Sequence, residues 1–189
     1  MRPTKRDELV QKALLVFYRN GFHATGMDML ATETGVSKTS MYKHFRTKED
    51  LILAVLRLRD EKFRNWLIRR MEELGDTPQE QLIAMFDALG EWFVEADFHG
   101  CMFINASAEF AGSDDPIHMM SSEHKMLVLK YLRELTLAAD FSGHETLADE
   151  LMLLAEGAIV MAYVTGDKTA AARAKNAAEK LIQKTFDPK

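Results

Sequence analysis

The sequence is poor in residues that cross-link or interrupt a chain, with one cysteine, four prolines and ten glycines among 189 residues. A single cysteine cannot form an internal disulfide, which excludes a disulfide-stapled secreted scaffold and favours a reducing compartment. Few glycines and prolines leave few turns, which favours long helices. Apolar residues make up 47% and charged residues 28%, and this composition excludes wholesale disorder.

Long hydrophobic runs are also absent. No stretch approaches the roughly 20 apolar residues of a membrane-spanning helix. The basic start of the chain is followed at once by Asp7 and Glu8 rather than by an apolar run, which argues against a signal peptide. We therefore expect a cytoplasmic protein that has no contact with a membrane.

Positive charge is concentrated near the start of the chain. Residues 1–70 carry 15 Lys and Arg against eight Asp and Glu, a net charge of +7, whereas residues 71–189 carry nine against 21, a net of −12. A basic surface on an acidic protein suggests a polyanionic partner. Chance clustering explains the charge alone about as well, so the motifs must decide.

Apolar residues recur at helical spacing through almost the whole chain, as in Val10, Leu14 and Phe17, and no segment has the period of a strand. The sequence predicts an all-α fold of about nine helices, in which the first helix ends at Asn20-Gly21 and a short one carries Met27 and stops at Gly35. The other expected helices span residues 38–44, 48–74, 78–96, 101–110, 117–139, 145–164 and 168–186.

Three side chains near the N-terminus have the positions of helix caps. Thr25 with Asp28, and Thr47 with Asp50, each fit a capping box, and Ser37 is a good N-cap for the helix that starts at residue 38. The backbone amides of the helix starts at Thr25, Ser37 and Thr47 are candidate anion sites.

Residues 28–48 have the pattern of a helix-turn-helix motif. Gly35 lies where the chain must bend, Ala31 allows close helix approach, and Val36, Met41 and Phe45 can face a core. In this motif the second helix places its N-terminal residues against base edges in the major groove.

The exposed face of that second helix carries groups that can contact DNA. Lys38 can offer its ammonium to guanine, and Thr39 can contact a base or a phosphate. The phosphate contacts are expected from Tyr42, Lys43, His44 and Lys48. The alternatives are a packing role for Tyr42, a capping or solvated position for His44, and a solvated lysine at position 43.

Residues 6–55 resemble the DNA-binding domain of the tetracycline-repressor (TetR) family of bacterial transcriptional regulators. The matching residues are Ala13, Phe17, Gly21-Phe22, Ala24-Thr25, Ala31, Gly35-Val36-Ser37-Lys38, Met41-Tyr42, His44-Phe45, Lys48-Glu49 and Leu51. The resemblance implies an N-terminal helix-turn-helix domain, residues 1–47, and a helical ligand-binding and dimerisation domain, residues 48–189. It also implies a homodimer that binds a palindromic operator in double-stranded DNA, usually as a repressor, and releases it when a small molecule binds.

The resemblance also assigns DNA contacts. Thr25 matches a phosphate-binding cap, Ser37 matches the cap of the recognition helix, and Lys38 and Thr39 fall at base-reading positions. Phosphate contacts of the family match Tyr42, His44 and Lys48. Two departures are Gly26, which replaces a hydroxyl residue, and Thr39, which replaces a common glycine and adds a side chain at the base edge.

Large soft side chains in the middle of the chain are candidates for an effector pocket. The candidates are Phe86, Trp92, Phe93, Cys101, Phe103 and Met120. The alternative for each is ordinary core. Cys101 follows Gly100 near an expected helix start, where a thiolate that senses electrophiles would be favoured. The sequence nevertheless favours the alternative of a small buried residue.

The last two expected helices are rich in small residues, which suggests that they pair with their symmetry mates in a homodimer. The residues expected at this interface are Leu147, Leu151, Leu154, Ala155, Ala158, Ile159, Ala162, Ala171, Ala174, Ala178 and Leu181. The alternative is packing within one chain.

Catalytic and metal-binding patterns are absent from the sequence. It has no nucleophile elbow, phosphate-binding glycine loop or HExxH motif, and the spacings of His99, His118, His124 and His144 match no zinc site. We expect no enzyme, no metal and no cofactor. The alternative to an effector-controlled regulator is a dimeric DNA-binding protein whose C-terminal part serves only dimerisation or a protein partner.

Overall fold

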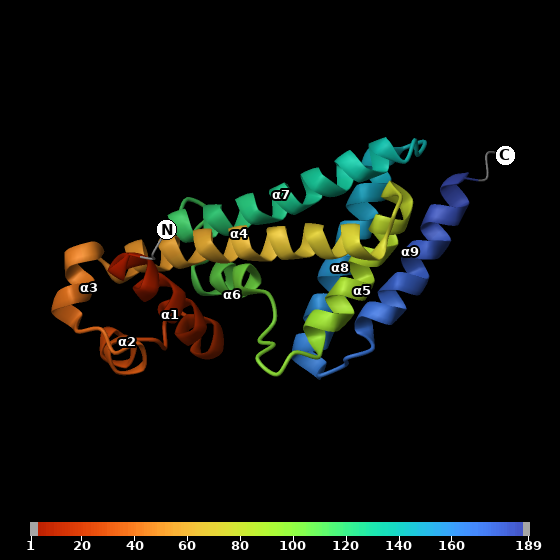
Figure 1. The fold of residues 1–189 in the computed structure, drawn as a ribbon. Helices are drawn as coiled ribbons and strands as arrows, with labels where there is room; N and C mark the ends of the chain where they lie inside the picture. Colours follow the sequence, from red (N-terminus) through yellow and green to blue (C-terminus); the bar gives the residue numbers. More distant parts are fainter. Residues whose placement is uncertain (1–3, 187–189) are drawn as a thin grey trace. The chain divides into compact units, whose positions relative to one another are not determined.

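The computed structural model describes residues 4–186, and within that range the chain forms nine α-helices and no strand (Figure 1). The all-α expectation is confirmed. The helices are α1 (Lys5–Asn20), α2 (Met27–Thr34), α3 (Lys38–His44), α4 (Lys48–Leu74), α5 (Pro78–Phe93), α6 (Met102–Glu109), α7 (Pro116–Ala138), α8 (His144–Thr165) and α9 (Ala170–Phe186).

Helix ends lie within three residues of the expected positions. The start of α9 differs because the carboxylate of Asp167 accepts hydrogen bonds from the amide and hydroxyl of Thr169, which keeps residues 167–169 in a turn. The helix therefore begins at Ala170 rather than at Lys168. None of the helices within residues 4–186 is long and apolar enough to cross a membrane.

The chain forms two compact units, each assembled from separate stretches of sequence. The first contains the described residues up to Phe63 together with Met102–His124, and the second contains Arg64–Cys101 together with the described residues from Lys125 onward. Helices α4 and α7 each contribute to both units. The boundary between a DNA-binding and a regulatory domain, expected between residues 47 and 48, stays a prediction. The two compact units are defined by packing, which does not show where one function ends and another begins.

The first unit is built around the apolar faces of α1, α2, α3 and the start of α4. Its fully buried side chains include Leu9, Phe17, Leu30, Met41 and Val55. A capping box starts α1: the hydroxyl of Thr4 accepts from the Asp7 amide, and the Asp7 carboxylate accepts from the Thr4 amide. The pKa of Asp7 is lowered because its carboxylate accepts a hydrogen bond from the Thr4 hydroxyl at 2.7 Å and another from the Thr4 amide.

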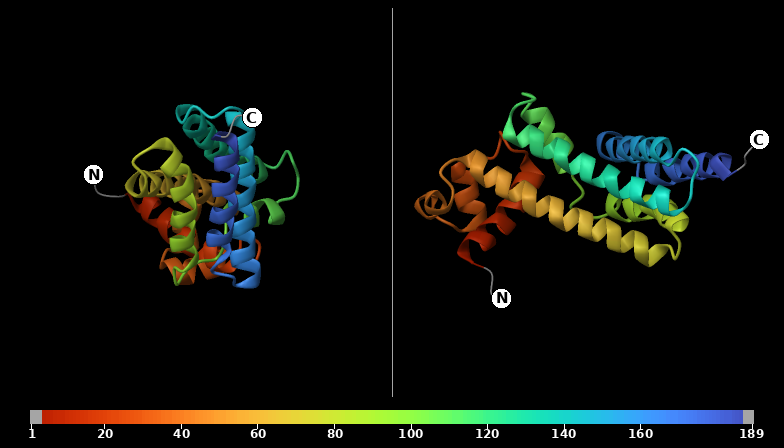
Figure 2. Two further views of the ribbon diagram at one scale, coloured as in Figure 1. Left: turned by 90° about the vertical axis from the view of Figure 1, so that its right-hand side faces the viewer. Right: turned by 90° about the horizontal axis from the view of Figure 1, so that it is seen from above.

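The second unit packs α5, α8 and α9 together, with α8 and α9 side by side (Figure 2). Thr77 and Glu80 form a capping box at the start of α5, and Pro78 occupies its first turn. Small residues let α8 and α9 approach closely. The buried residues on these two helices are Leu147, Ala148, Leu151, Met152, Ala155, Ala158, Ile159, Ala162, Ala170, Ala171, Ala174, Ala178 and Ile182.

The face of α8 and α9 expected at a dimer interface is therefore largely part of the chain's own core. Ala155, Ala158 and Ala162 are each at most 5% exposed in the single chain, so they cannot also form the surface that meets a second copy. The alternative of packing within one chain is correct for these alanines. Any interface on α8 must use its opposite face.

Candidate nucleic-acid interface

Helices α2 and α3 are joined by a tight turn whose geometry follows from its residues. Gly35 adopts the left-handed conformation, with φ of 69°, and its amide donates to the carbonyl of Ala31, which ends α2. The Ser37 hydroxyl then accepts from the amide of Ser40 at 3.2 Å and begins α3. The predicted N-cap at Ser37 is confirmed, and Met41 anchors α3 in the core with no exposed surface.

Replacing Ser37 with alanine should lower the free energy of unfolding by about 1 kcal/mol, because α3 loses the acceptor for its first-turn amide. Urea unfolding followed by circular dichroism measures the change. Thr39→Ala is the control, since Thr39 is exposed on the same turn and its hydroxyl is not a cap. Equal stability of the two variants would contradict the capping role.

One side of α3 is free to meet a double helix. Thr39, Tyr42, Lys43 and His44 are exposed, and Tyr42 keeps 51% of its surface, so its ring is not a core residue. The ammonium of Lys38 lies 2.5 Å from a carboxylate oxygen of Asp28 on α2. The lysine expected to read bases is therefore held across the motif by a highly exposed acidic partner.

The expected capping box at Thr25 and Asp28 is wrong. Gly26 is the N-cap of α2, and no side chain caps this helix. Thr25 is fully buried and donates its hydroxyl to the carbonyl of Gly21 at 2.6 Å. The threonine hydroxyl is thus used inside the loop between α1 and α2, and the phosphate contact expected of Thr25 stays a prediction.

The start of α4 confirms one expectation and shows a contact of Lys48 that was not expected, while the phosphate contact of Lys48 stays a prediction. Thr47 and Asp50 form the expected capping box, with both side chain–backbone hydrogen bonds at 3.1 Å. The Lys48 ammonium, however, donates to the carbonyls of Phe22 at 3.0 Å and Thr25 at 3.4 Å. Lys48 thus connects α4 to the loop between α1 and α2, and the sequence spacing gave no sign of this contact.

The six residues expected to line an effector pocket fall in both compact units. Phe86, Trp92, Phe93 and Cys101 belong to the second unit, and Phe103 and Met120 belong to the first. In the second unit the ring centroid of Phe98 lies 5.0 Å from that of Trp92 and 5.2 Å from that of Phe93. In the first unit Phe103 stacks on His124 with centroids 3.7 Å apart. A single pocket built from all six stays a prediction.

Cys101 has a charged neighbour that the sequence did not reveal. Its thiol is 7% exposed, and the Lys125 ammonium lies 3.3 Å from the sulfur and 2.7 Å from both carboxylate oxygens of Glu156. Burial alone would lower the pKa of Lys125, but the charges on Cys101 and Glu156 and their hydrogen bonds outweigh burial, so this pKa is raised.

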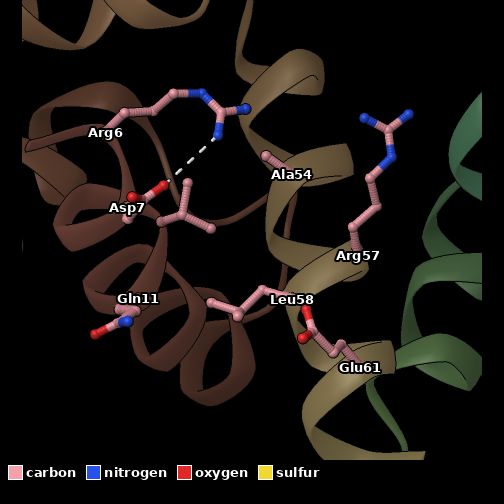
Figure 3. A pocket seen from close by; sticks show the side chains of 8 residues that line it. Arg6, Asp7, Gln11, Ala54, Arg57, Leu58 and Glu61 are labelled. Atoms are coloured by element: carbon pink, nitrogen blue, oxygen red, sulfur yellow. Dashed lines mark ion pairs between the residues drawn. The ribbon is translucent and has the colours of Figure 1, made fainter. Parts of the chain in front are cut away.

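Two surface grooves lie within the units. One, of about 410 Å³, lies between α1 and α4; it has an apolar floor that includes Leu58 and a rim of both charges (Figure 3). Arg6 on this rim lies 3.9 Å from Asp7. The other, of about 450 Å³, lies between α5 and α9, where the Lys175 ammonium pairs with Asp87 at 2.7 Å. Charges of both signs line each groove.

Two of the four histidines that were considered as metal ligands have contacts of another kind. His124 is buried and its Nδ1 lies 2.7 Å from an Asp60 carboxylate oxygen, and Nδ1 of His118 lies 2.9 Å from the carbonyl of Phe110. Among the described residues, no group of three or more His, Cys, Asp or Glu is placed to hold a metal ion. The expectations of no metal and no cofactor stay predictions.

Comparisons with known proteins match both parts of the chain. Residues 9–55 match the model of bacterial regulatory proteins of the tetR family, and residues 78–178 match that of the tetracyclin repressor-like C-terminal domain. The HTH-type transcriptional regulator YjdC of Escherichia coli K12 is 21% identical over 179 residues, covering 95% of this chain and 94% of YjdC.

One further relative matches part of the sequence, and one solved structure matches the fold. The HTH-type transcriptional repressor KstR2 of Mycolicibacterium smegmatis is 36% identical over 88 residues, which are 45% of this chain and 41% of KstR2. The TetR-family regulator SCO4454 from Streptomyces coelicolor has the same fold, with a TM-score of 0.88, 24% identity and 96% of each chain covered. From the two family models and the helix-turn-helix geometry, we conclude that the chain belongs to the tetR family of helix-turn-helix transcriptional regulators.

Proposed function

We propose that this regulator is a homodimeric repressor that binds a palindromic operator through α3 and releases it when a small hydrophobic or reactive effector binds. The observation that carries the proposal is the exposed face of α3, where Lys38, Thr39 and Tyr42 project from a helix fixed by its Ser37 cap and its buried Met41.

Selection of bound sequences from a random DNA pool tests this proposal, and a palindrome is the expected result. Lys38→Ala should change the base preference within each half-site, because Lys38 stands at the base-reading start of α3. Lys43→Ala removes the same charge from the same helix. It should weaken binding to all sequences alike and reduce the salt slope by about 1, as expected for a phosphate contact. A uniform loss for both variants would contradict this division of roles.

Asp28→Asn should increase DNA affinity several-fold at low salt. The Asp28 carboxylate competes with DNA for the Lys38 ammonium at 2.5 Å and adds negative charge near the expected phosphates. Glu33→Gln is the matched control, since Glu33 is an exposed acid on the same helix. Fluorescence anisotropy with the selected operator measures both variants, and an equal gain would mean that only net charge matters.

Dimerisation is proposed through an exposed apolar stripe on α8. Leu153, Val160, Met161 and Val164 are between 40% and 73% exposed, and with Gly157 they recur at a spacing that puts them on one side of the helix. This side is opposite the alanines that pack inside the chain. A second copy of α8 is the occupant expected, because a palindromic operator requires a two-fold symmetric reader.

A reactive effector is supported by the contact of Cys101 with Lys125. N-ethylmaleimide is a suitable probe, because a thiolate adds across its activated double bond and forms a carbon–sulfur bond without a leaving group. We expect it to release the wild-type protein from DNA and to leave Cys101→Ser bound. Cys101 is the only cysteine in the sequence, so the variant has no other thiol. Release of Cys101→Ser would contradict a thiol sensor and leave a non-covalent hydrophobic effector.

The alternative is a dimeric DNA-binding protein without an effector, whose C-terminal part serves only dimerisation or a protein partner. A set of hydrophobic small molecules tested for release of the operator complex discriminates the two, because an effector-independent protein would stay bound with all of them.

A further inference from the structure

The loop between α1 and α2, residues 21–26, is held from two sides by side chains that come later in the chain. The Glu109 carboxylate, at the end of α6, accepts from the amide of Phe22 at 3.0 and 3.1 Å and from the amide of His23 at 2.5 Å. On the other side, the Lys48 ammonium of α4 donates hydrogen bonds to the carbonyls of Phe22 and Thr25. A carboxylate thus binds the donors of the loop, and an ammonium binds its acceptors.

The shape of the loop leaves space for that carboxylate. Gly21 has a φ of 81°, and a Cβ atom built on it would lie 3.0 Å from the Glu109 Oε1. Aromatic contacts add to the hydrogen bonds: the ring of Phe110, the residue after Glu109, lies 6.2 Å from that of Phe22 and 4.6 Å from that of His23. Phe22 itself is 1% exposed. The loop is therefore docked on the end of α6 by both polar and apolar contacts.

The loop that Glu109 holds leads directly into the helix-turn-helix. Helix α2 begins at Met27, directly after the loop, and α2 packs against α3. Glu109 and all its partners lie in the first compact unit. Hydrogen bonds in which one partner is charged are stronger than those between neutral groups, so the Glu109 carboxylate holds the amides of the loop firmly.

We propose that Glu109 is a positioning residue for DNA binding: through the amides of Phe22 and His23 it fixes the helix-turn-helix on α6. The inference rests on the proposed function. In a dimer the two copies of α3 must enter successive major grooves, about 34–36 Å apart. A helix-turn-helix that moves relative to α6 would spread this separation over a range of values. Binding to two half-sites would then weaken, whereas binding to one half-site would not change.

Glu109→Gln tests the inference, because glutamine has nearly the same shape but no charge, and only one oxygen remains to accept. Glu123→Gln, at an exposed position on α7, is the control for the loss of one negative charge. Both variants are measured by fluorescence anisotropy on the selected palindrome, on palindromes with one or two base pairs added or removed at the centre, and on a single half-site.

We expect Glu109→Gln to lose about tenfold in affinity for the optimal palindrome and to discriminate less between spacings, with half-site affinity within about twofold of wild type. Glu123→Gln should behave as wild type. Hydrogen exchange at the Phe22 and His23 amides should become about tenfold faster in Glu109→Gln, with or without DNA. If this variant does not fold, Glu109→Asp takes its place, since aspartate keeps the charge but is one methylene shorter.

Equal loss on the half-site and the palindrome would show a general effect on folding and overturn the inference. An unchanged dependence on spacing would also overturn it. Wild-type protein that binds no DNA, or that prefers no paired half-sites, would instead overturn the proposed function on which this inference rests. The exchange measurement needs no DNA, so it separates the two failures.

Discussion

Replacing Val164 with glutamate should convert the protein to a monomer and reduce its affinity for the operator by about three orders of magnitude. Val164 is 73% exposed and lies on the same side of α8 as Leu153 and Val160. Two copies of the new carboxylate would face each other across a two-fold axis in an apolar contact, where a charge without a partner is costly to bury. One monomer would then bind only one half-site.

Light scattering at micromolar concentration measures the oligomeric state of this variant, and fluorescence anisotropy its DNA affinity. Leu137→Glu is the control, because Leu137 is an apolar residue that is 61% exposed on α7, outside the stripe on α8. Leu137→Glu should remain a dimer. A dimeric Val164→Glu variant would show that the second copy binds elsewhere.

Replacing Phe93 with alanine should lower the free energy of unfolding by about 3–5 kcal/mol. Phe93 is fully buried, and its ring centroid lies 5.9 Å from that of Trp92 and 5.2 Å from that of Phe98. Truncation would leave a cavity beside these two aromatic rings at the end of α5.

The neighbouring residue provides a control for this second variant. Val94 is 66% exposed, so Val94→Ala should change stability by no more than about 0.5 kcal/mol. Urea unfolding at one fixed protein concentration compares the two, because the stability of a dimer depends on concentration. A loss below about 1 kcal/mol for Phe93→Ala would mean that the aromatic cluster repacks.

Features that depend on neighbours in the sequence could be predicted without the structure. The Ser37 cap, the capping box of Thr47 and Asp50, and the end of α2 at Gly35 are each determined within a few residues. For the same reason, the recognition helix and its exposed face could be expected from residues 35–45 alone. The resemblance to the tetR family, which rests on the same stretch, is confirmed.

Features that depend on distant contacts could not be predicted. Whether Thr25 or Gly26 caps α2 depends on the hydroxyl of Thr25 turning back to Gly21, which the spacing does not show. The side of α8 that is covered within the chain depends on α5 and α9. Glu109 binds amides 86 and 87 residues earlier in the chain, and a carboxylate at a helix end gives no sign of such partners.

The division into two interleaved units has a consequence for biosynthesis. When a ribosome has synthesised residues 1–63, it has made the helix-turn-helix but not Glu109 or Phe110, which complete the same unit. Until then the amides of Phe22 and His23 have only water as a partner, and the ring of Phe22 lacks part of its cover. The DNA-reading end of the protein is thus translated first but finishes folding only after more than half of the chain has been made.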